Sequence, residues 1–391
     1  MASALVIVFL LPLRAQQNPS PGMNGYRVAD LMRKALHGDR SAQTRMGIAL
    51  ARGEGVAQNE SEAIGWFSKA AVAGDPQAQY SLGVMLYNGK GGPKNVEAAA
   101  AWFIKAANAG LPQAQFSAAY LYKAGVGVPQ NLGRALALFG EAAKHGYPPA
   151  QNNLGNMYAY GVGVAREPVL AVKLFRKAAE QGDSVGEFNL GAMYWNGTGV
   201  PRDFTEAMHW FRLAAEQGHP RAQMMLGTIY RDGNGAPKDY QAAIAWFLKA
   251  AQQNNAEAQN KLGILYLKGQ GLAQDDVQAS TWFSKAAELG DPGAQANLGA
   301  LYKAGIGVPR DWIQAYKWYK LSHQDGVIDR RGQLSELAAS MSHSDVAEAE
   351  RMANVWQDAH DESKRQGLDP AQEGVQEASS CPDCVLLPNF P

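Results

Sequence analysis

The stretch that decides the fold, residues 74–109, reads GDPQAQYSLGVMLYNGKGGPKNVEAAAAWFIKAANA and recurs along the chain at a fixed interval. Corresponding units begin at Gly38, Gly74, Gly110, Gly146, Gly182, Gly218, Asn254 and Gly290. Each start follows the previous one by 36 residues, so eight units cover residues 38–325 without an insertion or deletion. A fixed period of this size is typical of solenoids, in which each repeat packs only against its neighbours.

Each unit predicts two helices, and the first is marked by a face of apolar residues. In the sixth unit these are Ala222, Leu226, Ile229 and Tyr230, at i, i+4, i+7 and i+8. A glycine recurs beside this face in seven units, and the third unit has Ala119 in its place. The glycines are Gly47, Gly83, Gly155, Gly191, Gly227, Gly263 and Gly299. Because a helical glycine costs about 1 kcal/mol relative to alanine, we expect another helix to pass too close here for a side chain.

A GxG pair follows the first helix, as in Gly125 and Gly127, and predicts a left-handed helix end and a tight reversal. A polar N-cap then opens the second helix in seven units, with Glu167 as the exception. The predicted caps are Asn59, Asn95, Asn131, Asp203, Asp239, Asp275 and Asp311. The second helix carries an alanine in every unit and an aromatic ring four residues later. The rings are Phe67, Phe103, Phe139, Phe175, Phe211, Phe247, Phe283 and Tyr319.

These residues resemble a known repeat family. The pattern AQxxLGxxYxxGxGVPxDxxxAxxWFxKAAxxG, present in residues 222–251 from Ala222-Gln223 to Ala250-Ala251, resembles the Sel1-like repeat, a relative of the tetratricopeptide repeat. The resemblance covers about three quarters of the chain. It implies an all-α fold, a right-handed α/α superhelical solenoid of helix-turn-helix repeats. It also implies a role as an adaptor or scaffold that binds a protein or peptide ligand.

One branch of that family is secreted, is rich in cysteine, staples each repeat with a disulfide and has been associated with β-lactam binding or hydrolysis. None of the eight units here contains cysteine, so the chain departs from that branch. The two cysteines, Cys381 and Cys384, form a CPDC pair near the end of the chain. No second pair and no nearby histidine accompanies them, so a local disulfide or no role is the favoured reading, and a metal or redox role remains an alternative.

The segments before and after the repeats are each assigned a role from their sequence. Residues 1–15 are predicted to be a signal peptide, because the apolar run at 4–13 is too short to span a bilayer and fits an export signal. Against this, no lysine or arginine precedes the run, and the alternative to export to the periplasm or beyond is a cytoplasmic location. Residues 16–37 are expected to form a linker and an N-terminal capping helix. Residues 326–366 predict C-terminal capping helices, the second opening at Ser344 as N-cap, and 367–391 predict a flexible tail.

Composition and motifs argue against several classes of function. Lysine plus arginine and aspartate plus glutamate both number 36, so the net charge is zero and lacks the basic excess typical of nucleic-acid or membrane-surface binding. The GxG pairs follow helices, whereas phosphate-binding loops follow strands. The seven histidines are scattered and form no HxxxH or HxxE arrangement. We therefore predict no catalytic residues, no cofactor, no metal, no nucleic-acid partner and no stable membrane insertion.

The seventh, eleventh and fourteenth residues of each unit share a different stripe of the first helix. In tetratricopeptide-like solenoids the first helices line the concave surface, so by analogy this stripe forms a groove. Aromatic and arginine side chains on such a face are typical of interface cores. The predicted partner-binding residues are Tyr80, Tyr87, Phe116, Tyr120, Lys123, Phe188, Trp195 and Arg231. The competing interpretation is that several of them pack under the neighbouring unit.

The sequence thus predicts a non-enzymatic scaffold that holds a peptide or protein segment in a concave groove. One alternative is an envelope protein that binds or hydrolyses a small molecule related to β-lactams or peptidoglycan. Another is a regulator of a partner enzyme that acts through the same groove.

Overall fold

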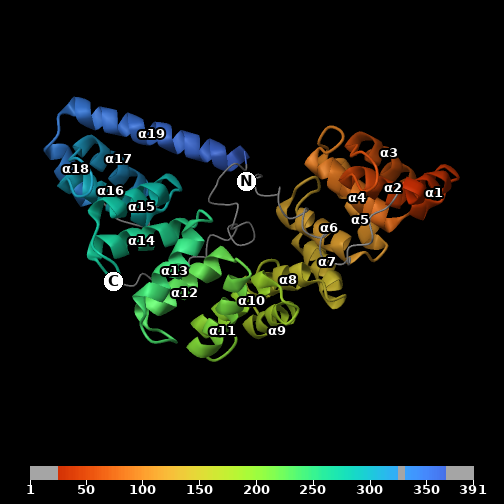
Figure 1. The fold of residues 1–391 in the computed structure, drawn as a ribbon, viewed down its shortest axis with the longest axis horizontal. Helices are drawn as coiled ribbons and strands as arrows, with labels where there is room; N and C mark the ends of the chain where they lie inside the picture. The colour runs from red at the N-terminus through yellow and green to blue at the C-terminus, as the bar shows by residue number, and fades with distance from the viewer. Residues whose placement is uncertain (1–24, 325–330, 367–391) are drawn as a thin grey trace. The chain divides into compact units, whose positions relative to one another are not determined.

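The computed structural model describes residues 25–324 and 331–366, and these contain nineteen helices and no strand (Figure 1). The helices are α1 Gly25–Leu36, α2 Arg40–Arg52, α3 Glu60–Val72, α4 Pro76–Asn88, α5 Val96–Asn108, α6 Pro112–Ala124, α7 Leu132–Lys144, α8 Pro148–Tyr160, α9 Pro168–Ala179, α10 Ser184–Asn196, α11 Phe204–Glu216, α12 Pro220–Asp232, α13 Tyr240–Ala251, α14 Ala256–Lys268, α15 Asp276–Glu288, α16 Pro292–Ala304, α17 Trp312–Gln324, α18 Arg331–Ala339 and α19 His343–Gln366. The all-α class and the helix pair within each 36-residue unit are therefore confirmed. The predicted signal peptide, the 367–391 tail and the Cys381/Cys384 pair lie outside the described residues.

The described chain divides into two compact units within α10. The N-terminal unit holds residues 25–193 and 197–201, and the C-terminal unit holds residues 194–196 and the described residues from 202 onward. In the N-terminal unit every pair of consecutive helices from α1·α2 to α8·α9 packs together. In the C-terminal unit α11 to α17 pack in the same way, and α18 and α19 both pack on α17. Within each unit the helices thus follow the nearest-neighbour order of a solenoid.

The recurrent glycine of the first helix faces the aromatic ring of the second helix in the same repeat. An added Cβ at Gly83 would lie 2.7 Å from the ring of Phe103, and one at Gly227 would lie 2.5 Å from the ring of Phe247. Both rings are fully buried. The prediction that another helix passes too close for a side chain is confirmed, and the close group is the aromatic ring of that helix.

The predicted helix ends are also confirmed. The side chain of Asn95 accepts a hydrogen bond from the Ala98 amide at 2.9 Å, and that of Asp239 accepts one from the Ala242 amide at 3.0 Å. Glu167 makes no such side-chain cap, as its exceptional place in the pattern indicates. At the first glycine of the GxG pair, φ is positive, with +69° at Gly125. These caps separate successive helices without the need for long loops.

One predicted boundary is wrong by two residues. The last helix, α19, begins at His343, and the Ser342 hydroxyl accepts a hydrogen bond from the Asp345 amide at 3.1 Å. Ser342 therefore caps this helix, and Ser344, which was expected to do so, lies inside its first turn. The Ser344 hydroxyl is 2.7 Å from that of Ser342, so it supports the cap through its neighbour.

Candidate functional site

Four of the eight predicted partner-binding side chains are buried in the helix packing. Tyr80, Tyr87, Phe116 and Phe188 expose between 2% and 7% of their surface. The Phe116 ring lies 5.7 Å from that of Phe139, on the second helix of its own repeat, and 5.5 Å from that of Tyr147, which opens the next repeat. The Tyr80 ring lies 5.6 Å from that of Phe103. The expectation that these four rings line an open groove is corrected, because their position on the helix turns them into the core.

Burial also changes the two tyrosines chemically. Desolvation raises the pKa of the Tyr80 phenol to about 12, against a smaller opposing effect of a hydrogen bond with Ser117. Desolvation raises the pKa of Tyr87 as well, with a second contribution from the nearby phenol of Tyr120. Both phenols therefore stay neutral at physiological pH, as core groups should.

The other four predicted residues, Tyr120, Lys123, Trp195 and Arg231, are half-exposed. Trp195 lies with its ring 4.7 Å from that of Phe204, at the start of the following second helix. Arg231 makes two contacts with the carboxylate of its neighbour Asp232, Nε to Oδ1 at 2.6 Å and Nη2 to Oδ2 at 2.7 Å. Tyr120 is the eleventh residue of its repeat, and Lys123, Trp195 and Arg231 are the fourteenth of theirs. The fourteenth position is not exposed in every repeat, because Tyr87 occupies it too and is buried.

The seventh position of the repeat has a structural role that the sequence analysis missed. In three repeats it contacts the second residue of the next repeat, and in these three the two residue types match. Asn260 Nδ2 donates to Asp291 Oδ1 at 2.8 Å, and Asn152 pairs with Asp183 in the same way. Where the seventh residue is Phe116, the partner is the ring of Tyr147 instead. In these three repeats the matching residue types lie 31 residues apart in the sequence.

Burial shifts the pKa of the two aspartates in these pairs. Desolvation raises the pKa of Asp291 to about 6, although the backbone amide of Ala294 donates to its Oδ1 at 2.6 Å and opposes the shift. The pKa of Asp183 is raised for the same reason and opposed by the Gly186 amide. Each carboxylate caps a first helix, which accounts for it without a catalytic role.

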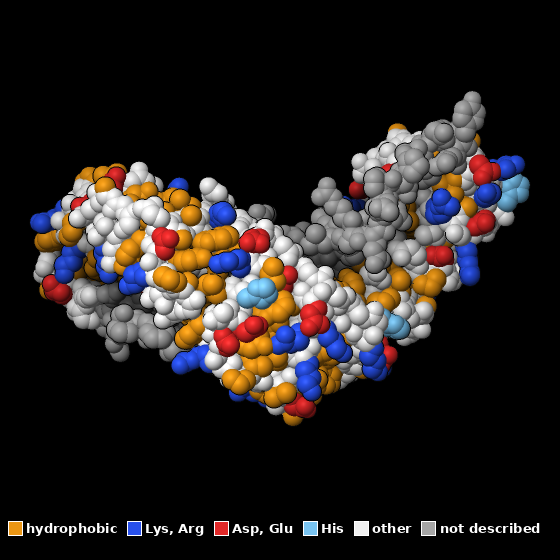
Figure 2. Space-filling model, turned by 60° about the horizontal axis from the view of Figure 1, so that its bottom comes forward, with side chains coloured by type: hydrophobic (Ala, Val, Ile, Leu, Met, Phe, Trp, Pro, Cys, Tyr) orange, Lys and Arg blue, Asp and Glu red, His pale blue; other side chains and the backbone are white. Residues whose placement is uncertain are grey.

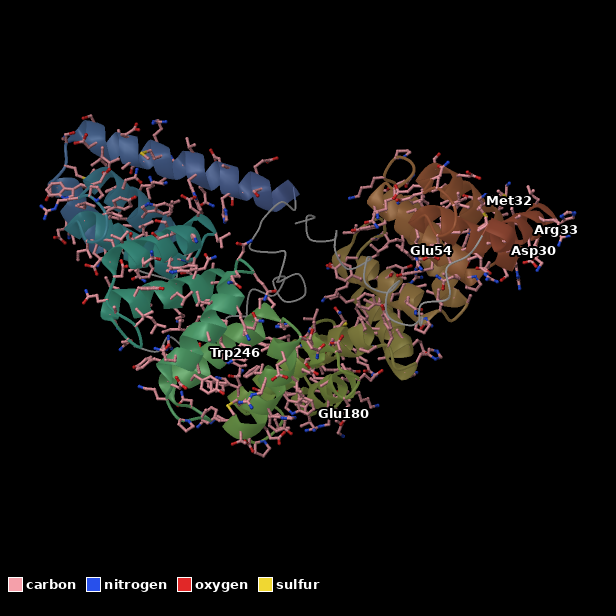
Figure 3. All side chains as sticks on the ribbon, in the orientation of Figure 1. Asp30, Met32, Arg33, Glu54, Glu180 and Trp246 are labelled. Atoms are coloured by element: carbon pink, nitrogen blue, oxygen red, sulfur yellow. The ribbon has the colours of Figure 1, made fainter. Side chains whose placement is uncertain are left out.

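The second helices carry a separate recurrent contact between a lysine and a tryptophan three residues earlier. Lys249 Nζ lies 4.1 Å from the centroid of the Trp246 ring, which Figure 3 labels on α13. The corresponding distances are 4.4 Å for Lys69 and Trp66, 4.1 Å for Lys105 and Trp102, and 4.5 Å for Lys285 and Trp282. Cation–π pairs stabilise by at least about 0.5–1 kcal/mol each. The repeated WFxK spacing in the sequence was sufficient to predict them.

The described residues hold no group of three or more histidine, cysteine, aspartate or glutamate side chains placed to bind a metal ion. The most perturbed histidine, His219, has its pKa lowered to about 4 by burial and by the nearby Arg221. Its Nδ1 accepts a hydrogen bond from the Ala222 amide at 3.2 Å, so it serves as an N-cap. The GxG pairs are structural as expected, since a Cβ at Gly127 would lie 2.7 Å from the Val96 carbonyl oxygen of the preceding repeat.

Charge is distributed evenly over the face shown in Figure 2, where acidic and basic side chains alternate between hydrophobic ones. Exposed ion pairs occur along the helices, such as Arg33 with Asp30 at 2.6 Å on α1 (Figure 3). The helices that the structure describes include none with the length and apolar character needed to cross a bilayer.

Fold and repeat geometry together define an α-solenoid built from helix pairs. The Sel1 repeat model matches residues 40–75, 76–111, 112–147, 148–183, 184–219, 220–255, 256–291 and 292–322. These eight consecutive matches cover most of the chain, which therefore belongs to the Sel1 repeat family. Solenoids of this family generally mediate protein–protein interactions and are generally non-catalytic.

Two solved structures show the same relationship. A Sel1 repeat protein from Oxalobacter formigenes is 29% identical, with a TM-score of 0.60, over 84% of this chain and 98% of that one. The protein c5321, a protective antigen of uropathogenic Escherichia coli strains, is 28% identical, with a TM-score of 0.56, over 87% of this chain and 92% of that one. No curated protein sequence matches the chain.

Proposed function

We propose that this protein is a non-enzymatic scaffold that binds a protein or peptide segment along its first helices. One observation carries the proposal, a row of half-buried side chains at the eleventh position of the repeat. Its members in the N-terminal unit are Ile48, Val84, Tyr120, Asn156 and Ala192, and those in the C-terminal unit are Thr228 and Ile264. We call it the first-helix row.

The first-helix row differs from the core in one respect that matters for recognition. The core positions repeat the same residue type, as the buried alanines and phenylalanines of the second helices do. In the row the residue type changes from repeat to repeat, between aliphatic, aromatic and polar side chains. A constant frame that presents changing, partly accessible side chains supports recognition of a specific partner.

Basic side chains beside the row favour a partner that carries acidic groups or a carboxylate. Lys123 lies three residues after Tyr120, and Arg231 lies three residues after Thr228, so each shares a helix face with its row residue. Arg231 forms a salt bridge with Asp232, so a carboxylate of the partner would replace that of Asp232 at the guanidinium. The buried rings of Tyr80, Tyr87, Phe116 and Phe188 take no part in this proposal.

The test replaces the charges beside the row and leaves the core intact. We expect the double variant Lys123→Glu/Arg231→Glu to lose specific partners in a crosslinking pull-down from native extract, identified by mass spectrometry. The matched control is Lys173→Glu/Lys177→Glu, which makes the same charge change at exposed positions of a second helix. Equal loss in both variants, or unchanged recovery in the first, would contradict the proposal. Turnover of a small substrate by the purified protein would favour the enzyme alternative instead.

We also propose that the protein is exported. The support is the apolar run at residues 4–13 followed by Arg14-Ala15-Gln16, in which Ala15 is a small residue suited to cleavage. Expression of the full sequence followed by fractionation and N-terminal sequencing tests this, and a cytoplasmic product that retains residues 1–15 would contradict it.

A further inference from the structure

We propose that a cavity between α13, α14 and α15 binds a primary carboxamide, of the kind that a glutamine side chain of a partner peptide carries. The cavity has a volume of about 490 Å³ and is lined by Gln259, Trp282, Lys285, Glu288 and Leu289, among others. It uses none of the residues on which the proposed function rests, so the two proposals stand or fall separately.

The first step concerns the buried glutamine at the sixth position of the repeat. Its side-chain amide donates to the carbonyl of an alanine in the preceding second helix. Gln259 Nε2 donates to the Ala251 carbonyl at 3.1 Å, and Gln223 Nε2 donates to the Ala215 carbonyl at 3.1 Å. This bond fixes the orientation of the amide, so its Oε1 points away from that carbonyl and requires a donor of its own.

Two other repeats show which group donates to this Oε1. In the sixth repeat Gln253, the last residue, donates its Nε2 to Gln223 Oε1 at 2.8 Å and to the Gly218 carbonyl at 3.0 Å. In the fourth repeat Gln181, also the last residue, donates to Gln151 Oε1 at 2.9 Å. The solenoid thus places a primary carboxamide from its own chain against the sixth-position glutamine at both places.

The seventh repeat lacks this internal carboxamide, because its last residue is Leu289. Gln259 is only 3% exposed, and its Oε1 is buried without a hydrogen-bond partner. The backbone carbonyl of Asn254 corresponds in the repeat to that of Gly218, which accepts from Gln253. Asn254 and Gln259 both line the cavity, so the groups that hold the carboxamide in the sixth repeat are repeated here without it.

A second buried group sets the polarity of the ligand. Trp282 lines the same cavity, and its indole Nε1 is a buried donor without a partner, whereas Trp210 Nε1 donates to Glu206 at 3.2 Å. A buried donor or acceptor without a partner is unfavourable, so a ligand that pairs with both groups is favoured. A primary carboxamide offers an N–H donor for Gln259 and a carbonyl acceptor for Trp282. A carboxylate lacks the donor and an ammonium lacks the acceptor.

The charged side chains that line the cavity also favour a neutral ligand. Lys285 and Glu288 contribute one positive and one negative side chain to the lining. Glu288 already accepts from the indole of Trp356 at 2.7 Å, and Lys285 lies over the Trp282 ring. Their opposite charges give no net preference for an anion or a cation.

The test observes the Trp282 indole directly in the full-length protein labelled with nitrogen-15, with its resonance assigned through Trp282→Phe. N-acetyl-glutamine methylamide is expected to shift this resonance saturably, with a dissociation constant on the order of 1 mM, as suits a ligand of this size. The glutamate and norleucine analogues, which match it in size, are expected to bind at least about tenfold more weakly. Free glutamine and a glutamine-containing peptide distinguish a metabolite from a peptide source.

A matched pair of variants closes the test. Leu289→Gln is expected to fill the cavity from within, as Gln253 does in the sixth repeat, and so abolish the shift and raise the melting temperature. Leu289→Met, of similar size without an amide, is expected to retain binding. Equal shifts with all three analogues, binding that survives Leu289→Gln, or no shift with any probe would overturn the proposal. The last result would mean that the cavity holds water alone.

Discussion

Replacing Gly227 with alanine tests the packing rule of the repeat most sharply. An ideal Cβ at this position lies 2.5 Å from two ring atoms of Phe247, about 1 Å closer than an ordinary contact between carbon atoms. Because Phe247 is fully buried, the ring cannot move away without displacing its neighbours. Overpacking of this kind costs about 1–3 kcal/mol, while alanine gains about 1 kcal/mol in helix propensity. We expect a net loss of about 0–2 kcal/mol in the free energy of unfolding, in place of the gain that propensity alone would give.

The chain contains its own controls for this prediction. Gly140 lies within α7 with no atom near its absent Cβ, so Gly140→Ala should gain about 0.4–1 kcal/mol from propensity alone. Thermal unfolding followed by circular dichroism compares the two variants, and each 1 kcal/mol corresponds to a shift of roughly 2 °C in a chain of this size. Phe247→Leu added to Gly227→Ala should recover part of the loss, because the smaller side chain makes room. Stabilisation by Gly227→Ala equal to that by Gly140→Ala would refute the steric argument.

Three further predictions concern caps, buried charge and the core. Asp291 has a folded-state pKa of about 6, above its unfolded value, so stability from this group is greatest below about pH 4 and falls as pH rises to 6. Asp291→Asn keeps the cap acceptor and should stabilise the C-terminal unit by roughly 2–3 kcal/mol at pH 8 and by little at pH 4. Urea unfolding at both pH values measures this, and equal effects at the two would contradict the raised pKa of Asp291. Asp239→Ala removes the acceptor for the Ala242 amide and should lower stability by about 1 kcal/mol, whereas Asp239→Asn should not, by thermal melting. Phe103→Ala should cost about 3–5 kcal/mol and raise amide exchange in α4 and α5 first; uniform exchange along the N-terminal unit would contradict nearest-neighbour packing.

The fold was largely predictable from the sequence because each of its signals is local. The glycine, the ring and the caps act within one repeat, so Gly83 and Phe103 or Asn95 and Ala98 could be paired from spacing alone. Eightfold repetition then separated these signals from chance. The Ser342 cap was harder to predict, because it lies outside the repeats and because Ser340, His343 and Ser344 stand beside it as alternative caps.

The candidate site was predictable only in part, because its exposure depends on contacts between repeats. Phe116 and Tyr120 lie four residues apart on one helix, yet Phe116 is buried and Tyr120 is half-exposed. The difference comes from Tyr147 of the next repeat, which covers Phe116. The Gln259 cavity depends likewise on Leu289, 30 residues further along, where the sixth repeat has Gln253. Two comparisons within the sequence could have separated buried from exposed residues. One compares the seventh position with the second position of the next repeat, and the other compares the sixth position with the last position of the same repeat.

The central functional claim is that a partner lies along the first-helix row, and site-specific photo-crosslinking tests it most directly. A photoreactive phenylalanine analogue at position 84 or 156 reports contacts to the row within the N-terminal unit, and the same group at 101 or 137 reports contacts to exposed positions of the second helices of that unit. The proposal predicts the same crosslinked protein from both row positions and none from the two second-helix positions. Crosslinks that form equally from all four positions, or only from 101 and 137, would contradict it.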